Sequence, residues 1–63
     1  MGYRIKELRE AKKMTQEELA EKSGVSRGTI SGLENGTARN TTSKTLLRIA
    51  EALEATLDQI FLL

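Results

Sequence analysis

The stretch that decides the fold is TQEELAEKSGVSRGTISGLENG, residues 15–36. It begins with Thr15 three residues before Glu18, which is the spacing of a capping box, in which each side chain bonds the other residue's backbone N–H. A helix is therefore predicted to begin at Thr15. Ser23-Gly24 is expected to end it, because glycine adopts the left-handed conformation at a helix C-terminus without strain.

A second short helix is predicted to follow directly. Ser26 is a favourable N-cap residue, and Ile30 and Leu33 lie on one helical face. Asn35-Gly36 then ends the helix with two residues that tolerate positive φ. Two helices joined by a short turn that contains glycine cross at a steep angle. Helices this short are not stable alone in water, so both are expected to pack on neighbouring segments.

The residues before this stretch also favour helix. Ile5 and Leu8 form a narrow apolar stripe in a helix predicted over about residues 3–13. The chain has no Pro and few aromatic residues, which favours helix throughout.

Two more helices are predicted towards the C-terminus. After a polar loop at residues 37–42, either Thr42 or Ser43 can cap a helix that runs to about Leu53. A last short helix is expected at 57–61. Its inward-facing residues should be Leu57, Ile60 and Phe61.

These segments predict an all-α domain of five short helices over residues 1–63, with a helix-turn-helix unit at about 15–36. The chain has neither Cys nor His, so it lacks the commonest general base and the commonest metal ligands. We therefore expect no enzyme activity, metal, cofactor or small-molecule ligand. No apolar run is long enough to cross a bilayer, and no signal peptide is evident, so a cytoplasmic location is expected.

The net charge of +1 says little about nucleic acid, but its distribution is uneven. Basic side chains exceed acidic ones in residues 1–14 and 26–44, and acidic ones dominate in 15–25 and 45–63. If the two basic segments meet on one surface, they form a weakly basic face. The alternative is an ordinary mixed, solvated surface.

The chain resembles the phage repressor and Cro family of helix-turn-helix domains, also called the XRE family, over nearly its whole length. The matching residues are Ile5, Leu8 and Arg9, then Thr15-Gln16-Glu17-Glu18-Leu19-Ala20, Gly24-Val25-Ser26, Thr29-Ile30, Leu33-Glu34-Asn35-Gly36, and Leu46, Ile49, Ala50, Leu53, Leu57 and Phe61. The resemblance implies a lambda-repressor-like globule of five helices, with a dimer that binds an operator in double-stranded DNA.

The resemblance also implies which residues contact bases. Ser26, Arg27, Gly28 and Gly32 fall where the family reads base edges. Arg27 is the best candidate for direct readout, because a guanidinium can bond the O6 and N7 atoms of guanine together. Its alternative role is a phosphate contact. The two glycines depart from the long polar residues often found there, so they can only permit close approach, leave room for a thymine methyl, or weaken specificity.

Phosphate contacts are expected on both sides of the second helix of the unit. Gln16 sits where the family grips a phosphate, at a helix start whose free N–H groups suit an anion. Asn35, Thr37 and Arg39 follow the recognition helix, where the DNA backbone across the groove would lie, and Lys44 adds charge nearby. A solvated side chain is the alternative at each position.

The resemblance assigns a structural ion pair to Arg9 and Glu34, which would tie the first helix to the end of the third. The alternative is two separate surface charges. The dimer interface is expected at the C-terminal helices, with Ala55, Leu57, Leu62 and Leu63 as candidates. A rival interpretation is that the last two leucines precede a larger C-terminal domain.

The leading hypothesis is a dimeric repressor that binds a palindromic operator through the major groove. The alternative is an antitoxin or another protein-interaction module, because the same fold serves such proteins. Salt dependence distinguishes the two, since DNA binding releases counterions and weakens steeply with salt.

Overall fold

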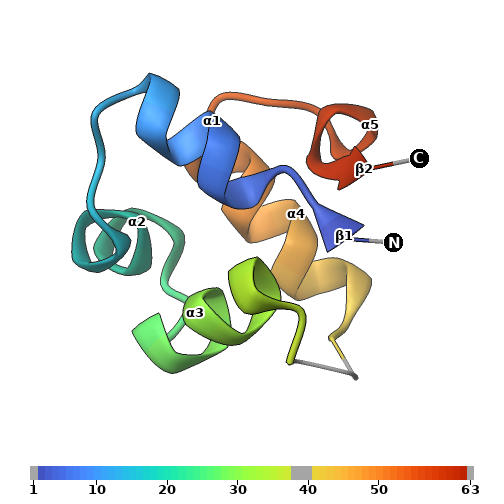
Figure 1. Ribbon diagram of the computed structural model, residues 1–63, viewed down its shortest axis with the longest axis horizontal. Helices are drawn as coiled ribbons and strands as arrows, with labels where there is room; N and C mark the ends of the chain where they lie inside the picture. The colour runs from blue at the N-terminus through green and yellow to red at the C-terminus, as the bar shows by residue number, and fades with distance from the viewer. Residues whose placement is uncertain (1, 38–40, 63) are drawn as a thin grey trace.

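The computed structural model describes residues 2–37 and 41–62 and contains the five expected helices (Figure 1). They are α1 (Ile5–Ala11), α2 (Gln16–Ser23), α3 (Arg27–Asn35), α4 (Ser43–Ala52) and α5 (Leu57–Ile60). Two strands of two residues each, β1 (Gly2–Tyr3) and β2 (Phe61–Leu62), lie at the ends of this series.

Hydroxyl side chains begin four of the helices. Thr15, Ser26, Thr42 and Thr56 each accept a hydrogen bond from the backbone N–H three residues later, at 3.0–3.2 Å. Thr15 also has the reciprocal bond, in which its N–H donates to Glu18 Oε1 at 2.8 Å. The capping box is therefore complete, and the predicted start of α2 is confirmed.

Left-handed residues lie at, or one residue beyond, the C-caps of four helices. Gly24 and Gly36 follow α2 and α3 with φ of 71° and 78°, as glycine allows. The chain turns after α1 and α4 through Lys13 and Glu54, which have φ of 54° and 55° without being glycine. Such a conformation brings the Cβ atom too close to a carbonyl oxygen, so both positions carry backbone strain.

The core lies where α4 meets the other helices (Figure 1). α2 packs against both α3 and α4, and α5 packs against α4. The turn between α2 and α3 is anchored by the buried Val25, whose N–H donates to Ser23 Oγ at 3.2 Å. The completely buried side chains are Ile5, Leu19, Ile30, Ile49 and Ile60. This packing holds the α2–α3 unit at a fixed crossing and supplies the tertiary support that short helices need.

The two strands correct what the sequence predicted for both ends of the chain. Tyr3 pairs with Phe61 in antiparallel register, so α1 begins at Ile5 rather than at Tyr3. Phe61 belongs to β2 and is 38% exposed, so its predicted inward orientation is wrong. Its ring instead lies 5.9 Å from the ring of Tyr3 at a tilted angle. Helical periodicity could not reveal a pair of strands this short.

No helix in the part of the chain that the structure describes has the length and apolar character needed to span a membrane.

Candidate nucleic-acid interface

The start of α3 presents an exposed polar face. Ser26, Arg27 and Gly28 are exposed, whereas Ile30 and Leu33, further along the helix, are buried in the core. The burial of those two residues fixes the rotation of the helix about its axis, because residues three apart share a face. The N-terminal end of α3 is therefore exposed to solvent.

Two of the four predicted base-contacting residues carry side chains on this face. The hydroxyl of Ser26 lies 2.8 Å from Thr29 Oγ1 and accepts from the Thr29 N–H, so it is already engaged in capping the helix. The Arg27 side chain is 63% exposed, and its nearest charged neighbour is Glu17, with Nη1 3.9 Å from Oε1. Arg27 is thus the side chain on this face with the freedom to reach a base.

The two glycines differ in their surroundings. Gly28 is exposed, and a Cβ atom added there would meet nothing within 4 Å. Gly32 is half-buried, and its carbonyl accepts hydrogen bonds from the Gly36 and Thr37 N–H groups at the end of the helix. Because Gly28 has no side chain, the surface of α3 is recessed at this residue. The Gly32 carbonyl, in contrast, helps to end the helix.

A buried ion pair fixes α3 against α1. Arg9 donates from Nε to Glu34 Oε2 at 2.8 Å and from Nη2 to Oε1 at 3.1 Å. Its remaining nitrogen, Nη1, donates to the Met14 carbonyl at 2.7 Å. The side chains of Arg9 and Glu34 are only 11% and 2% exposed. The expected ion pair is present, and its two-pronged geometry is the strong form of an arginine–carboxylate bond.

Gln16 extends this pair into a network of three. Its side-chain amide donates from Nε2 to Glu34 Oε1 at 3.0 Å. Gln16 was predicted to lie at a DNA phosphate, and nothing in the pattern of residues signalled this internal bond. The first residue of α2 is therefore tied to the penultimate residue of α3, so the two helix ends that flank the candidate interface are held together.

The network also determines the charge state of Glu34. Burial alone would raise the pKa of its carboxyl, but hydrogen bonds from Arg9 and Gln16 and the charge of Arg9 together hold that pKa below its usual value. The bond to Glu34 raises the pKa of Arg9 in turn. Both groups therefore stay charged at neutral pH.

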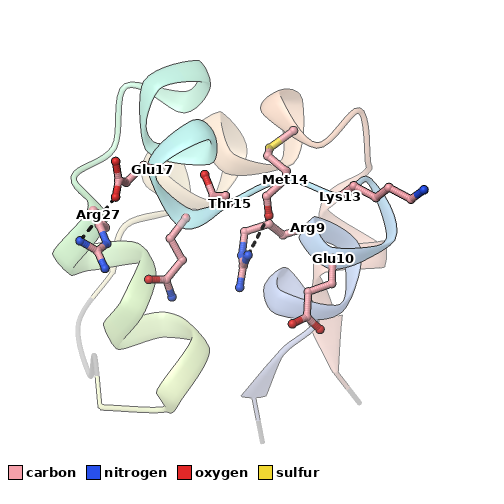
Figure 2. A pocket seen from close by; sticks show the side chains of 8 residues that line it. Arg9, Glu10, Lys13, Met14, Thr15, Glu17 and Arg27 are labelled. Carbon is pink, nitrogen blue, oxygen red and sulfur yellow. Dashed lines mark hydrogen bonds and ion pairs between the residues drawn. The ribbon is translucent and has the colours of Figure 1, made fainter.

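A shallow hollow of about 540 Å³ lies between the end of α1 and the starts of α2 and α3 (Figure 2). Its lining residues are Arg9, Glu10, Lys13, Met14, Thr15, Gln16, Glu17 and Arg27. Figure 2 shows Arg27 and Glu17 pointing toward each other at one rim, while Lys13 extends outward at the other. The hollow thus adjoins the N-terminal end of α2, where free backbone N–H groups favour an anion.

The remaining predicted phosphate contacts follow α3. Asn35 and Thr37 are both exposed. Asn35 donates to Ser31 Oγ at 3.3 Å, and the Thr37 hydroxyl donates to the Gly32 carbonyl at 3.4 Å. Both side chains lie at the C-terminal end of α3. Arg39 lies outside the described residues.

The predicted dimer residues are only partly placed. Ala55 and Leu57 are half-buried and pack against the core. The side chain of Leu62 and the whole of Leu63 lie outside the described part of the chain. The large apolar side chain with the greatest exposure among the described residues is instead Leu47, at 48%. Its position directly after the buried Leu46, out of phase with the core residues of α4, was the signal in the sequence.

Two further observations describe the site. Among residues 2–37 and 41–62, no group of His, Cys, Asp or Glu side chains is arranged to hold a metal ion. A helix with a buried apolar side and an exposed polar N-terminal end, packed against a second capped helix and joined to it by a short turn, is the architecture of a helix-turn-helix DNA-binding domain.

Comparison with known proteins places the chain in this class. A family model described as Helix-turn-helix matches residues 5–60. A protein named "Uncharacterized HTH-type transcriptional regulator" from Archaeoglobus fulgidus is 45% identical over 62 residues, which cover 98% of this chain and 86% of that protein. The Bacillus subtilis regulator RghRB is 36% identical over 59 residues, but this chain spans only 42% of its length.

A solved structure gives the same answer for the fold. The restriction-modification controller protein C.AhdI from Aeromonas hydrophila superposes with a TM-score of 0.85 at 40% identity, covering 92% of this chain and 86% of that one. The chain belongs to the XRE-type helix-turn-helix family of DNA-binding transcriptional regulators, which are not enzymes.

Proposed function

We propose that this protein is a cytoplasmic transcriptional repressor that binds a palindromic operator as a homodimer, with α3 in the major groove. The observation that carries the proposal is the exposed N-terminal face of α3, on which Arg27 is 63% exposed above a core-anchored helix. The major groove, about 12 Å wide, admits a helix presented in this way. Residues 1–63 act in this proposal as one domain, with 15–36 as the unit that docks.

Sequence recognition is assigned to the start of α3. Arg27 reads a guanine through its O6 and N7 atoms, and Ser26 lies beside it at the N-cap. Gly28 and Gly32 contribute no side chain, so their role is to let the DNA approach the backbone of α3. The similarity to a restriction-modification controller protein and to proteins named as transcriptional regulators supports a regulatory role of this kind.

We assign the positioning of the protein on the duplex to contacts with the DNA backbone on both sides of the groove. The N-terminus of α2, beginning at Gln16, faces one phosphate, while Asn35, Thr37 and Arg39 face the other strand. Because Gln16 is bonded to Glu34, it offers the phosphate its backbone N–H and holds the end of α2 in place.

Dimerisation is required because one module of this size makes few contacts. Two modules related by a two-fold axis address half-sites about 34 Å apart, one helical turn along the DNA. The seam is assigned to Ala55, Leu57, Leu62 and Leu63, and the exposed Leu47 on α4 supplies apolar area of the kind that association buries.

Selection of bound duplexes from a random library tests the proposal directly. We expect a palindromic consensus and a complex whose mass by light scattering corresponds to two chains per duplex. Binding to the selected duplex should weaken steeply with salt. A strict monomer on DNA would refute the homodimer. Absence of any selected consensus, together with a salt-insensitive protein partner, would favour the antitoxin class instead.

Two substitutions separate base readout from positioning. Arg27→Ala should cost about 1–3 kcal/mol of binding to the selected duplex and relax the preference at one base pair. Gln16→Ala should weaken binding to all duplexes by about the same factor. An equal loss on all sequences for Arg27→Ala would assign that side chain to a phosphate.

A further inference from the structure

We infer that Glu17 is an internal competitor of DNA for Arg27, and that it lowers the affinity of the protein for duplexes in general. This inference rests on the proposed function, because it concerns the side chain assigned to base recognition. The two groups face each other across the rim of the hollow, with 3.9 Å between Arg27 Nη1 and Glu17 Oε1 (Figure 2).

The length and exposure of the contact show what it can do. A charge-assisted hydrogen bond from a guanidinium to a carboxylate has a length of about 2.7–2.9 Å. At 3.9 Å, with the Arg27 and Glu17 side chains 63% and 77% exposed, the pair has attraction but no fixed geometry. It therefore does not hold the guanidinium in one orientation for a base, which would require a short bond and a buried partner.

The Glu17 carboxylate determines whether the rim of the hollow carries a net positive charge. Three of the lining side chains are cations (Arg9, Lys13, Arg27), and two are carboxylates (Glu10 and Glu17). Arg9 is already neutralised by Glu34. The remaining cations and carboxylates are equal in number, so the rim has no excess positive charge. Removal of one carboxylate there would make it positive.

DNA competes with Glu17 because it also supplies oxygen atoms that bind a guanidinium. A carboxylate oxygen is the same kind of ligand for a guanidinium as a phosphate oxygen or guanine O6, so DNA must replace Glu17 as the partner of Arg27. Phosphates that approach the start of α2 also meet the Glu17 charge at short range, which is repulsive. A poorly matched duplex makes few favourable contacts with Arg27. The free energy lost in displacing Glu17 is therefore a larger fraction of the total binding free energy of that duplex.

The test compares Glu17→Gln with Glu51→Gln. Both substitutions replace an exposed helical glutamate and change the net charge equally, but Glu51 lies on α4 and is not part of the hollow. The probes are the duplex recovered by selection and a scrambled duplex of the same length and composition. At low ionic strength we expect Glu17→Gln to bind both duplexes roughly two- to fivefold more tightly than Glu51→Gln does, the range of an exposed ion pair.

A double-mutant cycle shows whether the effect passes through Arg27. On the Arg27→Ala background, the gain from Glu17→Gln should shrink to the small part that repulsion between Glu17 and phosphate supplies, whereas repulsion alone would leave the whole gain unchanged. Equal affinities of Glu17→Gln and Glu51→Gln, an undiminished gain in the absence of Arg27, or weaker binding by Glu17→Gln would each overturn the inference. Failure of the unmodified protein to bind either duplex would instead overturn the proposed function. Thermal melting of each variant keeps stability separate from affinity.

Discussion

Gly28→Ala should make the protein more stable and, at the same time, a weaker DNA binder. Gly28 is the second residue of α3, is exposed, and has ordinary helical backbone with open space where a Cβ would lie. Alanine restricts the unfolded chain more than glycine does, and it costs nothing in the folded state when the backbone and the space permit it.

The size of the stabilisation follows from these facts. Gly→Ala at a compatible site is worth about 0.4–1 kcal/mol, and we expect the lower half of that range because the position lies in the first turn. For a domain of about 60 residues, 0.5 kcal/mol corresponds to a rise of about 2–4 °C in Tm. Thermal and urea unfolding followed by circular dichroism measure this change.

Gly36→Ala provides the matched control. A Cβ there also meets nothing within 4 Å, but φ is 78°, so alanine is strained whatever the space. We expect this variant to lose about 1 kcal/mol of unfolding free energy. Opposite signs for the two substitutions would show that backbone conformation, rather than packing, decides the outcome.

The binding measurement then tests the place of Gly28 on DNA. If the backbone of α3 approaches the duplex at this residue, an added methyl overfills a close contact and should cost about 1 kcal/mol or more, a loss of about fivefold or greater. Unchanged affinity would show that Gly28 lies away from the DNA, and a fall in stability would refute the account of its surroundings.

Three further predictions concern stability. Because the pKa of Glu34 is held below its usual value of 4.5 in the folded protein, its contribution to stability is complete above that value and is lost as the pH falls through the folded pKa. The unfolding free energy of Glu34→Gln should therefore fall less steeply with decreasing pH in the acid range, as measured by urea unfolding at a series of pH values. Arg9→Ala should cost about 3 kcal/mol by leaving Glu34 buried and unpaired, measured by urea unfolding, and a loss below about 1 kcal/mol would contradict burial of the pair. Lys13→Gly should stabilise the fold by about 1 kcal/mol by relieving positive φ, whereas Lys12→Gly, outside that conformation, should not.

The boundaries of α2 and α3 were predictable because they depend on neighbouring residues. The capping boxes and glycine stops place their partners within four positions, so Thr15, Ser26, Gly24 and Gly36 could be assigned from spacing alone. The end of α4 near Leu53 was also predicted, but the positive φ of Glu54 was not, because no residue type announces it.

The contacts within the site were harder to predict, because they join residues distant in sequence. Gln16 and Glu34 are 18 positions apart, and their bond exists only because α2 and α3 cross at a particular angle. The approach of Glu17 to Arg27 has the same origin. The resemblance to the family supplied the Arg9–Glu34 pair, which spacing alone would not have indicated.

Because β1 pairs with β2, residues near the two ends of the chain lie side by side. Gly2 stands opposite Leu62, and the Arg4 N–H donates to the Ile60 carbonyl at 2.7 Å, so the two ends leave from one corner of the molecule (Figure 1). A short peptide joining those ends, with a new opening elsewhere, would yield a circular permutant that retains every helix.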